Sequence, residues 1–184
     1  MGLFKKRLAT GAAVLALGGF LAACDNGGDT TDNGADTAEE TGDAVTAASI
    51  TSDPAEVAAS LSADGNWITA LTADVTVEEE ITVAGTFHDG GDEANDEYRK
   101  LALYEQDDDR NVTGEFTLTV PTLTVESPNF RIHNGTVDGD VYVDAEGFQL
   151  EEAVITGNLT FASEDIESSA SINGDVQGET TVEE

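Results

Sequence analysis

The sequence predicts an all-β fold: a short parallel β-helix (β-solenoid) of about 18 residues per coil, with a short helix at its N-terminal end. Apolar and polar residues alternate from about residue 75 onward, as they do in half-buried strands. Strand-like segments also recur, since Val141-Tyr142-Val143 returns as Leu159-Thr160-Phe161. A corner recurs with them, because Gly139-Asp140 returns as Gly157-Asn158.

Columns of apolar residues emerge when the segment from about 119 to 176 is aligned at this spacing. They are Leu123, Val141, Leu159 and Val176; Phe130, Phe148 and Ile166; and Val120, Val137, Ile155 and Ile172, with Gly139, Gly157 and Gly174 at the shared corner. One coil cannot bury its apolar side alone, so coils must stack. A β-sandwich is the main alternative, because alternation and turns occur in both folds. The three columns favour the β-helix.

A basic and then apolar segment opens the chain. Residues 5–7 are Lys-Lys-Arg, and residues 8–23 are apolar but too short and too rich in Gly and Ala for a permanent membrane span. The segment ends in Leu-Ala-Ala23-Cys24, which resembles the lipobox of bacterial lipoproteins. The resemblance implies cleavage between Ala23 and Cys24 and a lipid on the sulfur of Cys24, the sole cysteine. The protein would then be exported and anchored on the outer side of the cytoplasmic membrane or elsewhere in the envelope, and an ordinary signal peptide is the alternative.

The acid content excludes one class of partner. The chain has 38 acidic and 7 basic residues, a formal charge of −31, and three of the basic residues lie in the segment that cleavage removes. No basic patch remains to meet phosphates, so we expect no nucleic-acid partner. Such charge makes copies repel one another and keeps a protein soluble. It also fits life in concentrated salt, and composition leaves both explanations open.

The remaining chain divides into a tether and a domain. Residues 24–48 are predicted to be a disordered acidic tether, because they bury too little apolar surface to offset the cost of ordering. Residues 49–184 are predicted to form the β-helix domain, opened by a capping helix near 54–62. Asp53 is a suitable N-cap, with Pro at the first helical position and Glu at the third. We expect no further helix of convincing length.

Two acidic segments, 88–100 and 105–111, are expected to be loops inserted at corners. Their carboxylates, at Asp89, Asp92, Asp96, Asp107, Asp108 and Asp109, could gather around calcium, which needs six to eight oxygen ligands. None of them matches the spacing of an EF-hand loop. We therefore predict solvated loops without a cofactor or metal site, and weak calcium binding is the alternative.

The sequence indicates no catalytic constellation. His88 and His133 lie in polar contexts without a triad signature, so both are expected to be solvated surface residues. A calcium-dependent polysaccharide-active enzyme is a remote alternative, with Asp138, Asp140, Asp144 and Arg131 as its candidate residues. However, Asp140 recurs as Asn158 at the same corner, as a turn residue would. We expect a protein that is not an enzyme.

The pattern VDGDVYV, ITGNLTF, INGDV between residues 137 and 176 resembles the bactofilins, the polymer-forming cytoskeletal β-helix proteins. The resemblance is confined to the regular coils and rests on degenerate apolar–Gly–polar–apolar motifs. It implies a compact right-handed β-helix, no nucleotide cofactor and end-to-end assembly into filaments. This chain departs from the family in its export signal, its few regular coils and its acidity.

Together these features predict a lipid-anchored β-helix with a structural, scaffolding or self-assembly role. Open ends of a β-helix carry unpaired backbone groups, so copies could stack end to end. The capping helix with Trp67 would block stacking at the N-terminal end, and Glu179, Glu183 and Glu184 would oppose it at the other end by charge. A glycan- or protein-binding module is the alternative. A glycan site would need a strip of aromatic side chains, and only Tyr142 is expected to face outward in the regular coils.

Overall fold

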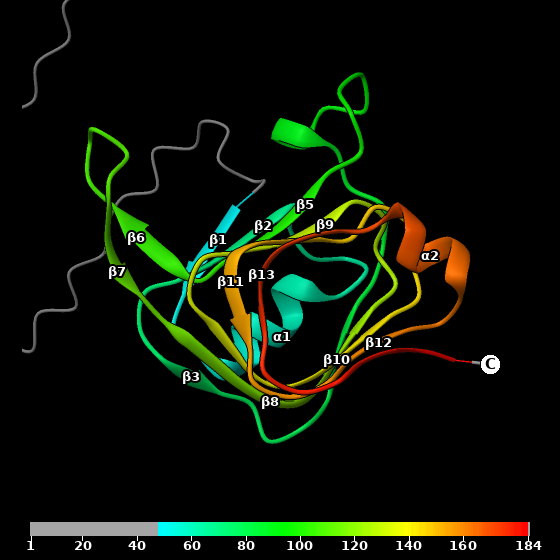
Figure 1. Cartoon of the computed structure of the whole chain (residues 1–184). Coiled ribbons are helices and arrows are strands. Elements are labelled where there is room, and N and C mark those ends of the chain that lie inside the picture. The colour runs from blue at the N-terminus through cyan, green and yellow to red at the C-terminus, as the bar shows by residue number, and fades with distance from the viewer. Residues whose placement is uncertain (1–47, 184) are drawn as a thin grey trace, which may run out of the picture. The chain divides into compact units, whose positions relative to one another are not determined.

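The computed structural model describes residues 48–183. The predicted signal peptide, Ala23, Cys24, all but the last residue of the predicted tether, and Glu184 lie outside the described residues. The described residues belong to one compact unit. Their fold is mostly β, as predicted: a parallel sheet of 12 strands curls around an apolar core, and a two-stranded hairpin projects from it (Figure 1).

The curled sheet has three faces, each built from successive passes of the chain. The first face consists of β1 (Ala48–Thr51), β2 (Ile68–Leu71), β5 (Arg99–Ala102), β9 (Phe130–His133) and the starts of β11 (Gln149–Ile155) and β13 (Ser171–Val176). The second consists of β3 (Val75–Thr76), the starts of β8 (Thr117–Val125) and β10 (Thr136–Val143), and the ends of β11 and β13. The third consists of β4 (Ile81–Val83), the ends of β8 and β10, β12 (Leu159–Phe161) and β14 (Thr180–Val182).

Inward side chains of the three faces form a single core. Leu101, Leu118, Leu123, Phe130, Ile132, Val143, Phe148, Leu150 and Ile155 are all fully buried, and the rings of Phe148 and Phe161 meet edge to face at 6.4 Å. Burying a side chain of this size contributes about 1.5–3 kcal/mol. The side chains between them point outward, because successive residues of a strand face opposite sides of the sheet.

The predicted coil spacing is confirmed between neighbouring passes in the middle of the chain. Leu123 pairs with Val141 and Val141 with Leu159, and Ile132 pairs with Leu150. The third predicted column is wrong at its first residue: Val137 pairs with Leu118, not with Val120. A register shift between Asp138 and Asp140, at the Gly139 corner, separates the two halves of this pairing.

The last pass departs from the predicted register, because it contains a helix that the sequence pattern did not predict. Ile166 does not continue a strand column; it lies in α2 (Glu164–Ser169), whose N-cap Ser163 accepts a hydrogen bond from the Ile166 backbone N–H through its hydroxyl. The extra residues lengthen the pass. Ile172 therefore pairs with Leu150, and Val176 pairs with Ile155. The third corner glycine is consequently Gly178, whose N–H donates to the carbonyl of Gly157, rather than Gly174.

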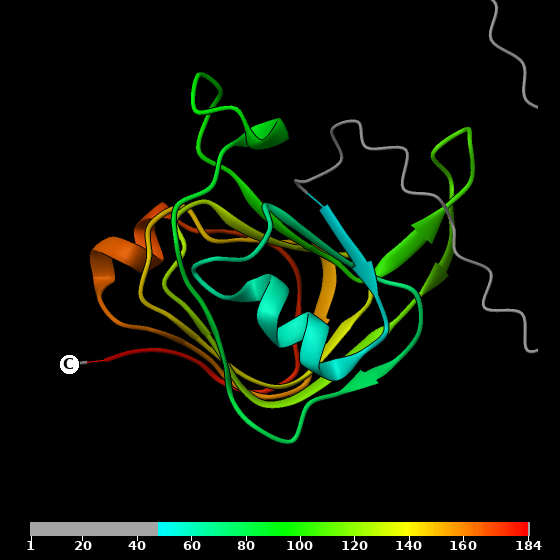
Figure 2. The ribbon, with the colours of Figure 1, turned by 180° about the vertical axis from the view of Figure 1, so that it is seen from behind.

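The predicted capping helix is confirmed as α1 (Pro54–Leu61), which packs against β1, β2 and β4 at the start of the curled sheet (Figure 2). The Asp53 carboxylate accepts hydrogen bonds from the Ala55 and Glu56 N–H groups. Val57 and Leu61 are fully buried in the core. No helix among residues 48–183 combines the length and apolar character needed to cross a membrane.

Two insertions interrupt the passes near the predicted positions, although their limits differ. The first runs from Phe87 to Tyr98 and contains the short helix η1 (Asp89–Gly91), whereas Arg99 and Lys100, predicted to be in this loop, belong to β5. The second is a hairpin of β6 (Tyr104–Gln106) and β7 (Val112–Glu115), which the sequence analysis did not predict as strands.

Candidate binding site on the first face

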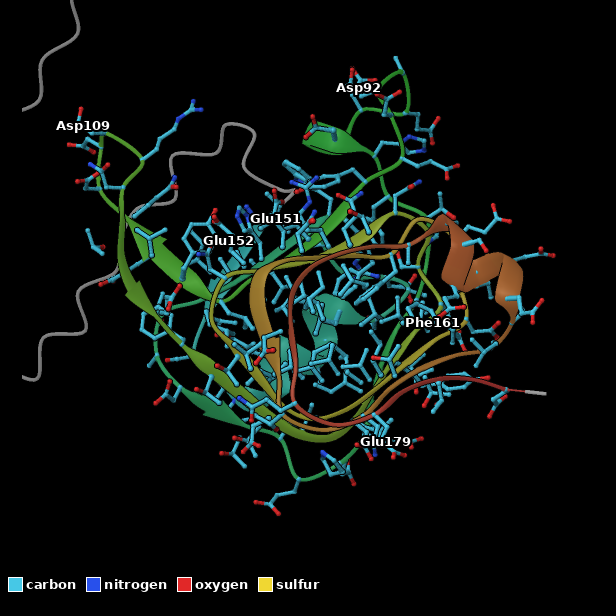
Figure 3. The ribbon with its side chains drawn as sticks, in the orientation of Figure 1. Asp92, Asp109, Glu151, Glu152, Phe161 and Glu179 are labelled. Atoms are coloured by element: carbon cyan, nitrogen blue, oxygen red, sulfur yellow. The ribbon has the colours of Figure 1, made fainter. Side chains whose placement is uncertain are left out.

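The two insertions flank the outer side of the first face (Figure 1). We call them the loop wall (residues 87–98) and the hairpin wall (residues 104–115). Figure 3 shows Asp92 at the tip of the loop wall and Asp109 at the tip of the hairpin wall, with Glu151 on the face between them. The structure therefore places two acidic projections on either side of a sheet surface.

Internal hydrogen bonds hold each wall in shape. In the loop wall, His88 pairs with Glu97 in an antiparallel bridge, the His88 Nδ1 lies 2.9 Å from the carbonyl of Asn95, and the Asn95 amide donates to the carbonyl of Asp89. In the hairpin wall, Asp107 accepts three hydrogen bonds from Asn111 and one from the Asp109 N–H. The hydrogen bonds from Asn111 are the main reason why the pKa of Asp107 is lowered.

The floor between the walls carries an aromatic and basic cluster. Lys100 pairs with Arg131 and Arg131 with Gln149, while Ala102 pairs with His133 and His133 with Glu151. These residues alternate with the buried Leu101, Ile132 and Leu150, so their side chains lie on the outer side of the sheet. Trp67, Tyr98 and Tyr104, at the edges of β2, β5 and β6, complete what we call the floor cluster: Trp67, Tyr98, Lys100, Tyr104, Arg131 and His133.

Contacts within the floor cluster tie its cations to its rings. The Lys100 ammonium donates a 2.8 Å hydrogen bond to the Tyr104 hydroxyl and lies 5.0 Å from the centre of that ring. The Tyr104 ring meets His133 edge to face at 5.0 Å. The Arg131 guanidinium lies 5.3 Å from the Tyr98 ring centre. Such cation–ring contacts are favourable and hold both partners in place.

Arg131 is also bound on its other side. It donates two hydrogen bonds, of 3.0 and 2.6 Å, to the amide oxygen of Gln149. It forms a 2.9 Å ion pair with Glu151. The charge of Arg131 is therefore balanced locally, and the guanidinium is fixed in orientation.

A hollow of about 480 Å³ lies between the loop wall and the floor. It is lined by Trp67, Ile68, Asp89, Asp96, Glu97, Tyr98, Lys100 and Arg131. The rings of Trp67 and Tyr98 lie 6.0 Å apart at an angle of 56°. The Trp67 Nε1 is buried without a hydrogen-bond partner among the described residues, and so is the Nδ1 of His133. Buried polar groups of this kind are commonly satisfied by ordered water or a ligand.

Burial shifts two titratable groups of the floor cluster. It raises the pKa of Tyr98, against the opposing effect of the Arg131 charge. It lowers the pKa of His133, and the nearby Lys100 charge lowers that pKa further. Tyr98 and His133 are thus both shifted toward their neutral forms, and His133 is half-buried rather than the solvated residue that the sequence predicted. His88 is also only partly exposed.

Beneath the floor, Arg99 fixes the first face to the capping helix. The side chain is completely buried, and its guanidinium donates to the carbonyls of Ser60, Ser62, Asn66 and Ala84 while it stacks 4.1 Å from the Phe87 ring centre. Burial lowers the pKa of Arg99 to about 10, so the group remains charged at neutral pH. Arg99 connects α1, the start of β2 and the base of the loop wall.

The structure does not gather the residues that the sequence analysis considered for catalysis. Arg131 lies on the first face, whereas Asp138 and Asp140 lie on β10, in the second face and at its corner with the third. Asp138 accepts a 2.7 Å hydrogen bond from the Thr156 hydroxyl. Asp140 accepts one from the Asn158 N–H, and the Asn158 side chain accepts in turn from the Glu179 N–H. Asp140 and Asn158 therefore hold successive corners, the backbone role expected for them.

The remaining predicted residues lie apart from one another. Tyr142 faces outward on the third face and donates a hydrogen bond to Glu183, which raises the Tyr142 pKa. The predicted calcium ligands are divided between the two walls. Within residues 48–183, no cluster of three or more Asp, Glu, His or Cys side chains is arranged to hold a metal ion. Weak calcium binding stays the alternative to the predicted solvated loops.

Trp67, expected beside the capping helix at the N-terminal end, lies against Tyr98 in the hollow. The floor cluster was missed because its residues come from strands that are not separated by the coil spacing. One signal was present: period-two alternation from Arg99 to Leu103 places Lys100 outward beside an aromatic residue. No protein-family model, curated protein or solved structure matches this chain.

Proposed function

We propose that this protein is a short right-handed parallel β-helix that a lipid on Cys24 anchors at a membrane, and that it has a scaffolding role through association with a second copy. The observation that carries the proposal is the difference between the two ends of the curled sheet. The lipid follows from the lipobox resemblance, and the right hand agrees with the usual hand of connections between parallel strands. The registers of β9 with β11 on the first face, and of the ends of β8 and β10 with β12 on the third, follow the coil spacing and support the β-helix.

A helix covers the core at the N-terminal end. Helix α1 covers it and buries Val57 and Leu61, and Arg99 bonds to the carbonyls around the end of that helix. Among residues 48–183, β1, β3 and β4 each keep one unpaired edge here, and Ile50 on β1 is 72% exposed. The helix nevertheless fills the end of the core, so a second copy finds no open core to continue, and this opposes the stacking that filaments require.

The C-terminal end is open among the described residues. Strand β13 pairs only with β11, and β14 pairs only with β12, so each leaves one edge unpaired. Ile172 on β13 is 40% exposed, whereas Leu150, its partner in the preceding pass, is fully buried. Unpaired strand edges with exposed apolar side chains are templates for pairing with another chain.

One end with an uncovered core per copy favours a closed pair rather than a filament. Two copies that meet through the same surface form a two-fold symmetric dimer, and that contact cannot propagate. The acidic residues Asp175, Glu179 and Glu183 on the last pass are exposed and oppose this contact by charge. Screening shortens from about 10 Å at 0.1 M salt to about 3 Å at 1 M, so the pair should form more readily at high salt.

Sedimentation of a soluble segment that begins at Ala48, from low salt to molar potassium chloride, tests the proposal. We expect a monomer that becomes a dimer, and no larger species, as salt increases. Ile172→Lys should abolish the dimer, whereas Val112→Lys, at a residue of matching exposure (43%) on the hairpin wall, should leave it intact. A monomer at every salt concentration, or equal effects of both variants, would contradict self-association. Cys24→Ser in the full chain should move the protein from the membrane fraction to the soluble fraction.

A further inference from the structure

The floor cluster and the hollow beside it play no part in the association described above. They lie on the passes of β2, β5 and β9, whereas the open end is formed by β13 and β14. Two angled aromatic rings, an ammonium, a guanidinium and three carboxylates line a single hollow of about 480 Å³. Concave surfaces that combine aromatic side chains with a few convergent polar groups are typical of ligand sites.

The chemistry of the lining fits a sugar. A pyranose ring has an apolar C–H face that can lie against an aromatic ring, and Trp67 and Tyr98 offer two such rings at an angle. Its hydroxyl groups both donate and accept hydrogen bonds. Asp89, Asp96 and Glu97 supply acceptors, and Lys100 supplies a donor. The Trp67 N–H of the floor cluster is buried and has no acceptor among the described residues.

The charges around the hollow favour an uncharged sugar over a charged one. Arg131 is already paired with Glu151, so the Lys100 ammonium alone would face an anionic ligand, against the three carboxylates of the lining. An anion would also meet the carboxylates of the loop wall and the field of a chain with a formal charge of −31. The same field attracts a cation, but a cation would have to approach the ammonium and the guanidinium on the floor. An uncharged ligand avoids repulsion by the carboxylates and by the floor alike.

We propose that the hollow between the loop wall and the floor cluster binds an uncharged oligosaccharide, with Trp67 and Tyr98 stacked on the sugar rings and the polar lining bonded to their hydroxyls. The hollow can hold a short run of sugar units, and the floor continues past Lys100 to Tyr104 and His133, which would extend the contact along the first face. This inference is independent of self-association, and its test does not depend on the dimer.

Intrinsic fluorescence reports on this site directly, because Trp67 is the sole tryptophan of the chain. The full chain, in a detergent without a sugar headgroup, would be titrated with uncharged hexasaccharides of glucose, mannose and N-acetylglucosamine. Hexagalacturonate, which is anionic, and hexaglucosamine, which is cationic, serve as charged probes of similar size. We expect at least one uncharged hexasaccharide to change the Trp67 emission saturably, and to bind more tightly than either charged probe.

Matched variants locate the binding. Tyr98→Ala should weaken binding about tenfold or more, since it removes a stacked ring, and Tyr98→Phe, which keeps the ring, should remain within about threefold of the parent. Tyr142→Ala removes an outward-facing aromatic side chain from the third face and should leave binding unchanged. Far-UV circular dichroism confirms that each variant is folded. The inference is overturned if no uncharged probe changes the emission, if a charged probe binds more tightly, or if Tyr98→Ala binds as the parent does.

Discussion

Replacing Arg99 by methionine tests whether this side chain holds the capping helix to the sheet. Methionine keeps most of the length and volume but provides no donor. The guanidinium is completely buried, and its four hydrogen bonds join carbonyls from the end of α1, the segment before β2 and the segment after β4. The substitution leaves those carbonyls without this donor in a site closed to water.

The magnitude follows from two opposing contributions. Hydrogen bonds to a charged group contribute about 1.5–3 kcal/mol each, so four amount to about 6–12 kcal/mol. Removing the guanidinium from water costs several kcal/mol in return. The difference leaves a net loss of about 3–5 kcal/mol for Arg99→Met, a large fraction of the 5–15 kcal/mol that stabilises a typical domain. Arg99→Lys should lose about 2 kcal/mol or more, because an ammonium has three donors and no planar fork to reach four separate carbonyls.

Urea unfolding of the segment that begins at Ala48, followed by far-UV circular dichroism, gives the free energy of unfolding for each variant. Arg110→Met is the matched control, because Arg110 is an exposed arginine at the tip of the hairpin wall, and we expect it to stay within about 0.5 kcal/mol of the parent. A loss below about 1 kcal/mol for Arg99→Met would show that Arg99 does not join these segments. An equal loss for Arg110→Met would show that overall charge, rather than the buried contacts, is responsible.

Two further predictions concern the backbone and the response to acid. Gly135→Ala should lower the free energy of unfolding by about 3 kcal/mol or more, since φ is +59° and a Cβ would collide with two backbone carbonyls. Gly90→Ala, with φ +69° and only an ordinary contact of 3.7 Å to the Asn95 side chain, should cost about 1–2 kcal/mol. The lowered pKa of His133 means that the unfolded chain takes up a proton first as the pH falls below about 6.5. Stability should therefore decrease from pH 7.5 toward pH 5.5, less steeply in His133→Gln; equal slopes in urea unfolding at each pH would contradict this.

The central passes and the capping helix could be predicted because local signals and the repeat agree there. Asp53 followed by proline specifies a helix start, and the contact of Asp140 with Asn158 follows from a corner repeated at the coil spacing. The last pass could not be placed by spacing, because α2 adds residues within it. Ser163 as N-cap and the acidic residues of the first turn indicate the start of this helix. The apolar Ile166 lies at the position expected for the second column, so the repeat pattern predicts a strand there instead.

The candidate site could not be assembled from the sequence, because insertions change the spacing upstream of residue 117. Ile68 pairs with Lys100, and Lys100 pairs with Arg131. The separations between these residues differ from the coil spacing, so the repeat does not predict the pairs. The buried arginine was recoverable in principle. Arg99 lies two residues before Leu101 and four before Leu103, so the period-two pattern of the strand places all three side chains on its inward side. An arginine on the inward side needs several buried hydrogen-bond acceptors.

The positions of the two proposed surfaces have a consequence for binding strength. The hollow belongs to passes near the helix-covered end, and the last pass, which forms the open end, contributes no residue to it. Pairing through β13 and β14 would therefore leave both hollows uncovered and give an assembly with two identical sites. Linked sites raise avidity for a polymer that spans them without changing the affinity of either site. Ile172→Lys, which breaks the pair, should therefore leave the affinity for a hexasaccharide unchanged, because each hollow stays intact. The same variant should bind a long glycan less tightly than the parent, because it no longer presents two linked sites.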